Sequence, residues 1–204
     1  MRPYRSYKTF IAARTDRNPC LQDLSDLLSK ETTSQPSQHA CRAVCIEFFT
    51  GSRPPNSQSL DFSSLASLLS NHRKNSDGCC GRILIIEDLS KDVVEMLGSM
   101  LNIDPLFFAS HIDTHQINMA TKRPSVATLP STARSQNFLN LHYHRVIQFE
   151  NPMPRQTLLR SMNLRRKVKV LPNTEGITIG IVRHCCSVLE TVGLDGLWLG
   201  ERDL

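Results

Sequence analysis

The stretch RILIIEDLSKDVVEMLGSMLNIDPLFFASHI, residues 82–112, decides the fold. It opens on a short continuous apolar run with three isoleucines, which is typical of an interior strand. Ser90 then supplies an N-cap oxygen, and apolar side chains recur at helical spacing over residues 93–101. Because the residue before Pro105 is disfavoured in a helix, that helix ends there, and a second short helix follows over 106–112. The stretch predicts a strand–helix–turn–helix unit.

Upstream of this unit, the pattern predicts helices and one strand. Leucines at helical spacing mark residues 21–28 and 60–69 as helices, and residues 43–49 are a strand candidate. The proline-bearing run 50–59 and the polar run 71–81 are expected to be loops. Residues 1–20 are expected to be loosely held, and residues 1–40 are interpreted as a poorly structured or helical N-terminal extension.

Downstream of the unit, strands dominate. Residues 113–137 are rich in Thr, Ser, Pro and Ala and predict a loop-rich insert. Apolar alternation then predicts strands over 140–150, 168–171, 177–183 and 186–189, with a turn at 172–176. Helices therefore come early and strands late, which predicts an α+β or mixed α/β class. We expect a single domain over residues 41–204, with a mixed sheet flanked by short helices.

Composition excludes several protein classes. The chain has 204 residues, of which 40% are hydrophobic and 21% charged, an ordinary globular balance. It contains no run of about 20 apolar residues, so no transmembrane segment is expected. Residues 1–8 have no apolar stretch after them, which predicts no signal peptide. Seven cysteines without a secretion signal favour reduced, structural thiols and a cytoplasmic location.

Charge is unevenly distributed. The net charge is +5, yet residues 114–174 carry ten basic residues and one acid, so this segment is +9 and the remainder −4. A nucleic-acid surface would join such a segment to stacking aromatics. Phe138, Tyr143 and Phe149 lie at strand positions that suit a core equally well. We therefore interpret the segment as a solvated basic face or an anchor for an acidic partner, with nucleic acid and anionic lipid as the less favoured alternatives.

Motifs for catalysis are absent from the sequence, which contains no phosphate loop, nucleophile elbow or zinc-protease signature. His184 is adjacent to Cys185, but neighbours in a strand point to opposite faces, so a thiol nucleophile lacks its base. We predict that the chain is not an enzyme and has no catalytic residues. Histidine pairs are the candidates for a metal site: one pair at helical spacing and one on a single strand face, namely His111, His115, His142 and His144. They would hold a divalent cation, Mg²⁺ or another, only if both pairs converge, and otherwise no cofactor is expected.

The unit at residues 82–112 resembles the cytosolic N-terminal domain of filamentous-fungal CorA-like magnesium transporters. In that family an apolar strand, a helix and an Ile-Asp-Pro-Leu-Phe turn, here residues 103–107, are characteristic. The stretches LHYHRV (141–146), RKVKVLP (166–172), GIVRHCCS (180–187) and DGLWLG (195–200) are similar to segments that follow it in the same proteins. The resemblance covers residues 82–200.

This resemblance implies a mixed α/β cytosolic domain that assembles beneath a channel. The stalk helix, the two membrane helices and the Gly-Met-Asn motif of the family are not in the sequence, so no pore residue is carried over. We expect a soluble, non-catalytic, truncated transporter homologue that binds partners or responds to divalent cations. Its expected partners are a second copy or a full-length CorA-like transporter, through which it would reach the cytosolic face of a membrane. The alternative is an accessory protein or metal-dependent enzyme of a fungal specialised-metabolite pathway, suggested by the histidine pairs and adjacent cysteines.

Overall fold

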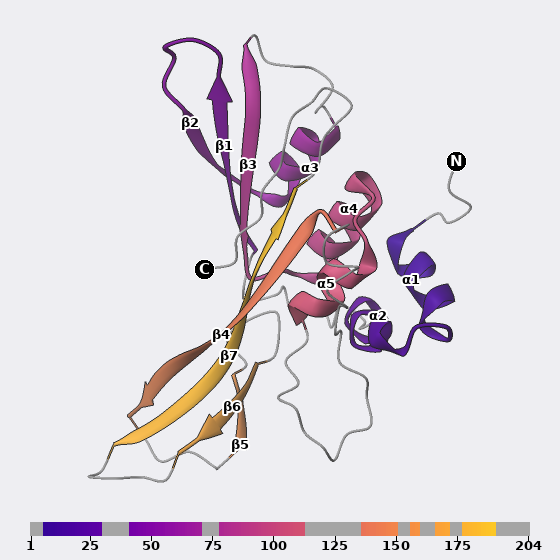
Figure 1. Ribbon diagram of the computed structural model, residues 1–204, viewed down its shortest axis with the longest axis vertical. Coiled ribbons are helices and arrows are strands. Elements are labelled where there is room, and N and C mark those ends of the chain that lie inside the picture. The colour runs from indigo at the N-terminus through magenta and orange to yellow at the C-terminus, as the bar shows by residue number, and fades with distance from the viewer. Residues whose placement is uncertain are drawn as a thin grey trace.

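Helices and two antiparallel sheets make up the described parts of the chain (Figure 1). The computed structural model describes residues 6–29, 41–70, 78–112, 136–150, 156–159, 166–171 and 177–190. In chain order the elements are α1 (Tyr7–Thr15), the 3-10 turn η1 (Pro19–Leu21), α2 (Gln22–Ser29), β1 (Arg42–Phe49), β2 (Asn56–Leu60), α3 (Phe62–Ser70), β3 (Cys79–Glu87), α4 (Lys91–Leu101), α5 (Pro105–Ile112), β4 (Phe138–Phe149), β5 (Gln156–Leu159), β6 (Arg166–Val170) and β7 (Thr178–Leu189).

The predicted α+β class is confirmed, but the strands form two antiparallel sheets instead of one mixed sheet. One sheet has the order β2-β1-β3, and the other has the order β4-β7-β6-β5. A mixed sheet needs a crossover that returns the chain to the same sheet in parallel. Here α4 and α5 follow β3, and the next described strand, β4, pairs with β7 instead of β3.

The strand–helix–helix unit has the predicted elements in the predicted order. The Oγ atom of Ser90 accepts the N–H of Val93 at 3.3 Å, and Asn102 ends α4 in the left-handed conformation, with φ 60° and ψ 39°. Asparagine is tolerated there because its short polar side chain bonds locally. The strand of this unit was expected in the interior of a sheet. Among the described strands β3 is instead at an edge, where it buries alternate side chains, including Leu84 and Ile86.

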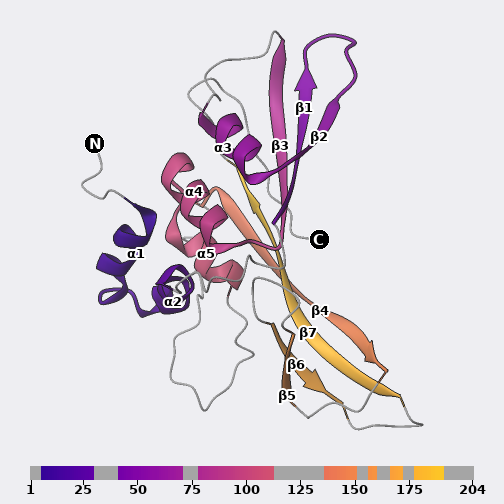
Figure 2. The same ribbon diagram turned by 180° about the vertical axis from the view of Figure 1, so that it is seen from behind.

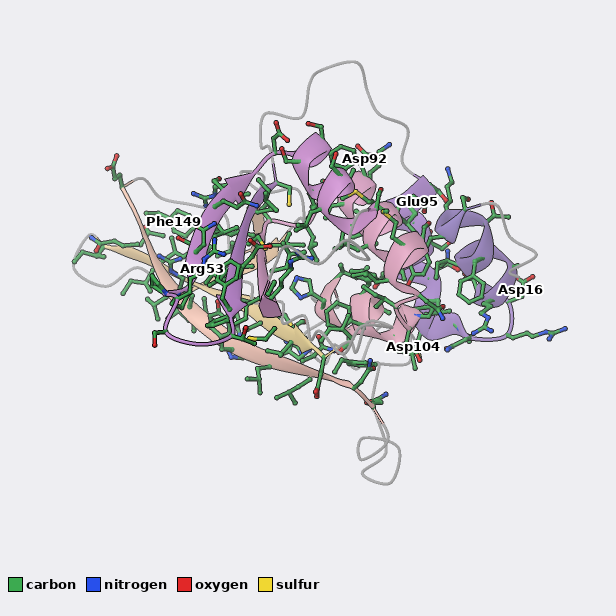
Figure 3. All side chains as sticks on the ribbon, turned by 90° about the horizontal axis from the view of Figure 1, so that it is seen from above. Asp16, Arg53, Asp92, Glu95, Asp104 and Phe149 are labelled. Atoms are coloured by element: carbon green, nitrogen blue, oxygen red, sulfur yellow. The ribbon has the colours of Figure 1, made fainter. Side chains whose placement is uncertain are left out.

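The N-terminal part of the chain is helical and packed, contrary to the expectation for residues 1–20. Tyr7 and Ile11 of α1 are 2% and 0% exposed. Glu95 lies on α4 (Figure 3). Its carboxylate accepts the N–H groups of Tyr7 at 2.8 Å and Lys8 at 2.6 Å, and the Tyr7 hydroxyl donates to the carbonyl of Ile103 at 3.0 Å. Ser6 caps this helix locally by accepting the N–H of Thr9 at 3.1 Å, and Glu95 adds two acceptors from α4, so sequence patterning missed the helix despite its local cap.

Two short strands were also missed. Residues 50–59 were expected to form a loop, yet β2 pairs with β1 over five residues. Four of these five residues, 56–59, are exposed, so the strand has no apolar alternation to reveal it. Likewise β5 pairs with β6, although no strand was predicted there.

Residues 178–189 form the single strand β7, where two strands were predicted. The buried positions shift from one face of β7 to the other between His184 and Cys185. Before the shift, Val182 packs with Val168 and Val170 of β6 in a small core. After it, Leu189 joins the main core beside the helices. The long β4–β7 ribbon therefore links two cores (Figure 2).

Within the described residues, no helix has the length and apolarity needed to cross a lipid bilayer.

Candidate functional site

A polar cluster lies between α5 and the C-terminal part of β7, where Cys185 and Ser187 are buried. It consists of His111 from α5, Asn140 and His142 from β4, and Cys185 and Ser187 from β7, and we call it the α5–β7 polar cluster. The register pairs Asn140 with Ser187 and His142 with Cys185, so the four strand side chains share one face. The last turn of α5 presents His111 to that face.

Hydrogen bonds connect these side chains in a chain. The Nδ1 atom of His111 is 2.7 Å from the Oγ atom of Ser187, which in turn donates to the Oδ1 atom of Asn140. Because the serine hydrogen is used toward Asn140, the Nδ1 atom of His111 carries a proton and donates to the serine oxygen. The Sγ atom of Cys185 is 3.4 Å from the Ser187 oxygen and 4.0 Å from the Nε2 atom of His142.

Burial decides what the cluster does. His111, Cys185 and Ser187 are each 1% exposed, whereas His142 at the outer end is exposed. A serine beside an imidazole resembles a nucleophile–base pair. The serine oxygen and the cysteine sulfur are both covered, however, and a substrate does not reach them in this structure. The network links α5 to the sheet through the buried bond between His111 and Ser187.

The four histidines predicted as metal candidates do not converge. His111 and His142 lie at opposite ends of the polar cluster, and His144 is two residues further along β4, opposite Arg183. His115 lies outside the described residues. The part of the chain that the structure describes contains no group of three or more His, Cys, Asp or Glu side chains arranged to hold a metal ion.

The candidate thiol Cys185 and the imidazole of His184 lie on opposite faces of β7, as the alternation of side chains along a strand predicts. Cys185 faces α5, whereas the ring of His184 stacks on Tyr143 of β4, with centroids 5.5 Å apart and an interplanar angle of 19°. Cys186 lies on the His184 side of the strand. None of the seven cysteines, all of which lie among the described residues, forms a disulfide in this structure.

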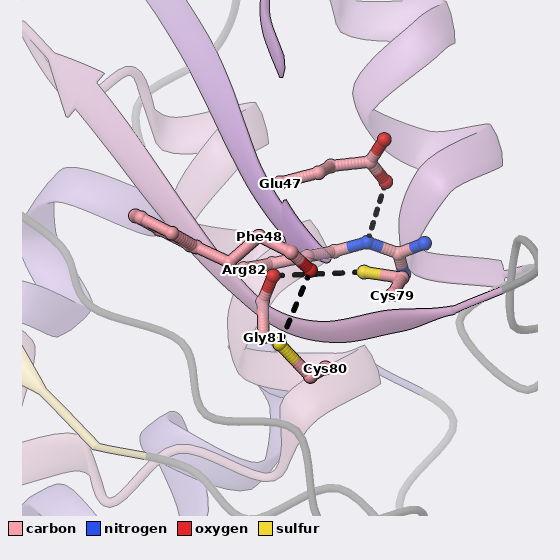
Figure 4. Close-up of polar contacts among 6 residues, drawn as sticks. All are labelled: Glu47, Phe48, Cys79, Cys80, Gly81 and Arg82. Carbon is pink, nitrogen blue, oxygen red and sulfur yellow. Dashed lines mark hydrogen bonds and ion pairs between the residues drawn. The ribbon is translucent and has the colours of Figure 1, made fainter. Parts of the chain in front are cut away.

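A nearly buried ion pair lies among the thiols of the three-stranded sheet (Figure 4). The Nε atom of Arg82 donates to the Oε1 atom of Glu47 at 2.8 Å, with the two side chains 8% and 13% exposed. The thiols of Cys79 and Cys80 donate to the carbonyl oxygens of Gly81 and Phe48, both at 3.5 Å. The two residues of the ion pair lie directly opposite each other in the register of β1 and β3, and removing one partner leaves a buried charge without its counter-ion.

The neighbouring thiol of Cys45 is protected from ionisation. Burial raises the pKa of Cys45 to about 11, and the negative charge of Glu47 raises it further than the positive charge of Arg82 lowers it. The nucleophilic form of cysteine is the thiolate. Cys45 is therefore a structural residue.

An apolar surface covers the other face of the β4–β7 ribbon. Leu139 is 55%, Leu141 52%, Tyr143 39% and Val188 40% exposed. The register sets Leu139 opposite Val188 and Leu141 opposite Cys186, so these side chains are neighbours on one face. We call them the β4–β7 apolar face. Contiguous exposed apolar side chains of this kind mark interaction sites more often than single exposed leucines do.

Sequence reasoning identified two members of the polar cluster and missed three: Asn140, Cys185 and Ser187. Their signal is a period of two, with polar side chains at 140, 142 and 144 on one strand and at 183, 185 and 187 on another. Apolar alternation predicted strands in these segments but not which of them pair, so these positions were not brought together. Only pairing of the two strands brings them beneath α5.

Comparison with protein-family models and with curated proteins gives no match to this chain.

Proposed function

We propose that this chain is a non-catalytic, partner-binding protein of the type of the CorA-like cytosolic domain. The observation that carries the proposal is the β4–β7 apolar face, with Leu139 and Leu141 more than half exposed. Burying a leucine side chain contributes about 1.5–3 kcal/mol, so an associating surface gains more from these residues than from polar ones. The partners proposed are a second copy and a full-length CorA-like transporter.

The interior of the molecule supports a binding role over a catalytic one. The two side chains of the α5–β7 polar cluster that resemble a catalytic pair are each 1% exposed, and the Nδ1 atom of His111 bonds to the Oγ atom of Ser187. The apolar face, in contrast, lies on the β4–β7 ribbon. Pairing with β7 at twelve positions fixes the backbone of β4 there. A surface held this way needs little ordering when it binds, and that lowers the cost of association.

The test is association of the wild-type chain and of Leu141→Glu. Sedimentation velocity over a concentration series, together with co-purification of a co-expressed full-length CorA-like transporter, is expected to show binding for the wild type. Leu141→Glu places a charge in the centre of the apolar face and is expected to abolish it. Phe62→Glu is the matched control, because Phe62 is 51% exposed and belongs to α3, outside the four-stranded sheet. A wild-type chain that stays monomeric and leaves the transporter unbound contradicts the proposal.

A further inference from the structure

The strand β4 has an open edge in the described structure. The strand order of the four-stranded sheet is β4-β7-β6-β5 (Figure 2). One edge of β4 therefore pairs with β7, and no described strand pairs with its other edge. The six residues 141–146 in the middle of β4 are all exposed. With twelve residues, β4 is longer than most strands of globular proteins. A long open edge is a template for a further strand.

The register shows which residues offer hydrogen bonds at this edge. The N–H of Glu190 donates to the carbonyl oxygen of Asn137 at 2.8 Å, and these residues lie directly opposite each other one step beyond the Phe138–Leu189 pair. Because directly bonded pairs alternate in an antiparallel ladder, the odd-numbered residues of β4 bond to β7. The even-numbered residues direct their N–H and C=O groups to the open edge: Asn140, His142, His144, Val146 and Gln148.

The side chains at this edge differ between its two faces. His142 and His144 share a face with Arg183 of β7 and Lys169 of β6, and three of these four, all but Arg183, are exposed. None of the described strands β4, β5, β6 and β7 contains an aspartate or glutamate. The other face carries Leu141 and Tyr143 of the apolar face. The edge is therefore basic on one side and apolar on the other.

We propose that the open edge of β4 binds an extended segment of a partner protein, in which acidic and apolar residues alternate, as an added strand. Main-chain hydrogen bonds to residues 140–148 hold such a segment, and side chains of alternate residues select it. Its acidic residues lie beside His142, His144 and Arg183, and its apolar residues extend the row of Leu141 and Tyr143. This inference rests on the proposed partner-binding function and specifies the chemistry of the partner.

Charge selects such a partner over a second copy at this edge. Antiparallel pairing of two β4 strands about their middle sets His142 or His144 opposite a histidine of the other copy. It also sets the two basic faces side by side. Protonated histidines opposite each other destabilise a strand pair, whereas an acidic residue opposite a protonated histidine stabilises it.

The probe is a fluorescein-labelled peptide of about ten residues in which glutamate and valine alternate, a strand of the length that β4 can pair. Fluorescence anisotropy is expected to show saturable binding that weakens with added salt, since the charges are exposed. The same peptide with N-methyl groups on all residues, which removes the main-chain donors along both of its edges, and a lysine–valine peptide are expected not to bind. The full-length chain is used throughout.

Val146→Pro is the decisive variant. It removes an N–H that points to the open edge and leaves the bonds to β7 intact, which is where proline is tolerated in a sheet. Val146→Thr keeps the N–H and is the matched control. The proline variant is expected to bind the peptide about tenfold more weakly, and the threonine variant as the wild type does. Far-ultraviolet circular dichroism of both variants checks that β4 still folds.

Charge reversal tests the acidic preference. His144→Glu is expected to weaken binding about tenfold, whereas Arg53→Glu, in the connection between β1 and β2, is expected to leave it unchanged. Equal peptide binding by Val146→Pro and Val146→Thr overturns the inference. It is also overturned if the wild type is a dimer and Val146→Pro is a monomer, because a second copy would then occupy the edge. The inference is overturned in favour of nucleic acid if an RNA oligonucleotide displaces the peptide from the wild type and does not bind His144→Glu. If Leu141→Glu abolishes association but the peptide never binds, the edge inference fails and the proposed function stands.

Discussion

Gly98 is a residue where close approach, not turn geometry, requires glycine. A Cβ atom at this position of α4 would lie 2.5 Å from the Cε1 atom of Tyr7. Tyr7 has no room to retreat, because its ring is 2% exposed and its hydroxyl donates to Ile103. The absence of a side chain on α4 therefore lets α1 lie against it.

Gly98→Ala is expected to destabilise the protein, although alanine normally stabilises a helix by about 0.5–1 kcal/mol relative to glycine. Overpacking against Tyr7 outweighs that gain and lowers the free energy of unfolding by about 1–3 kcal/mol. Urea unfolding measures the change, with the exposed neighbour Ser99→Ala as control. A Gly98→Ala variant as stable as the wild type would show that α1 does not hold Tyr7 in this position.

Cys45 gives stability a dependence on alkaline pH. Its pKa is raised from 9.0 to about 11 in the folded chain, chiefly by burial, so between these values the folded state keeps a proton that the unfolded state loses. The free energy of unfolding therefore falls as pH rises from about 9 to about 11. Thermal melts across this range are expected to show a shallower decline for Cys45→Ala, which has no group to titrate. Equal slopes for both proteins would mean that the thiol ionises as easily folded as unfolded.

At the scale of elements, Glu95 holds α1 to α4. Its carboxylate accepts two N–H groups from the first turn of α1, at the positive end of that helix. Glu95→Ala is expected to cost about 1 kcal/mol and to speed hydrogen exchange selectively in residues 7–15. Glu95→Gln keeps one acceptor oxygen without the charge and is expected to give an intermediate effect. Exchange in α1 that matches the wild type in both variants would assign its docking to apolar contacts alone.

Elements with local signals were predictable, and those that depend on remote partners were not. The cap at Ser90 and leucine spacing located α2, α3, α4 and α5, because these signals lie within each segment. The helix α1 has a local cap at Ser6 but docks through Glu95, 88 positions away, and β2 depends on pairing with β1. For the candidate site, histidine spacing found His111 and His142 but not Ser187 between them.

The strand β7 shows that a change in the buried face of a strand does not mark the end of its hydrogen-bonded pairing. Its apolar positions change parity between His184 and Cys185, and the sequence pattern predicted a break there. The register with β4 runs unbroken from Phe138 to Phe149, however. A strand that packs each half on a different core keeps its hydrogen bonds and changes only the face that it buries. Burial parity alone therefore does not reveal where a strand ends.

At the scale of the whole molecule, β7 connects two cores of unequal size. The main core contains side chains from the five helices α1–α5 and from the three-stranded sheet, together with Leu189 of β7. The small core contains the buried residues Val168, Val170 and Val182, with Ile147 and Phe149 packed against it. Stability scales with buried apolar contacts, so the region around the small core is expected to open at a lower free energy than the helices.

Val182→Ala separates the two cores experimentally. Truncating this side chain, which is 0% exposed, is expected to destabilise the small core by about 1–2 kcal/mol. Native-state hydrogen exchange is expected to speed up about tenfold in residues 166–170 and in the N-terminal half of β7. Residues 105–112 of α5 are expected to keep their protection, because Phe107 and Phe108 lie in the main core. A uniform loss of protection in α5 and β6 would instead show that the ribbon and the helices unfold as one cooperative unit.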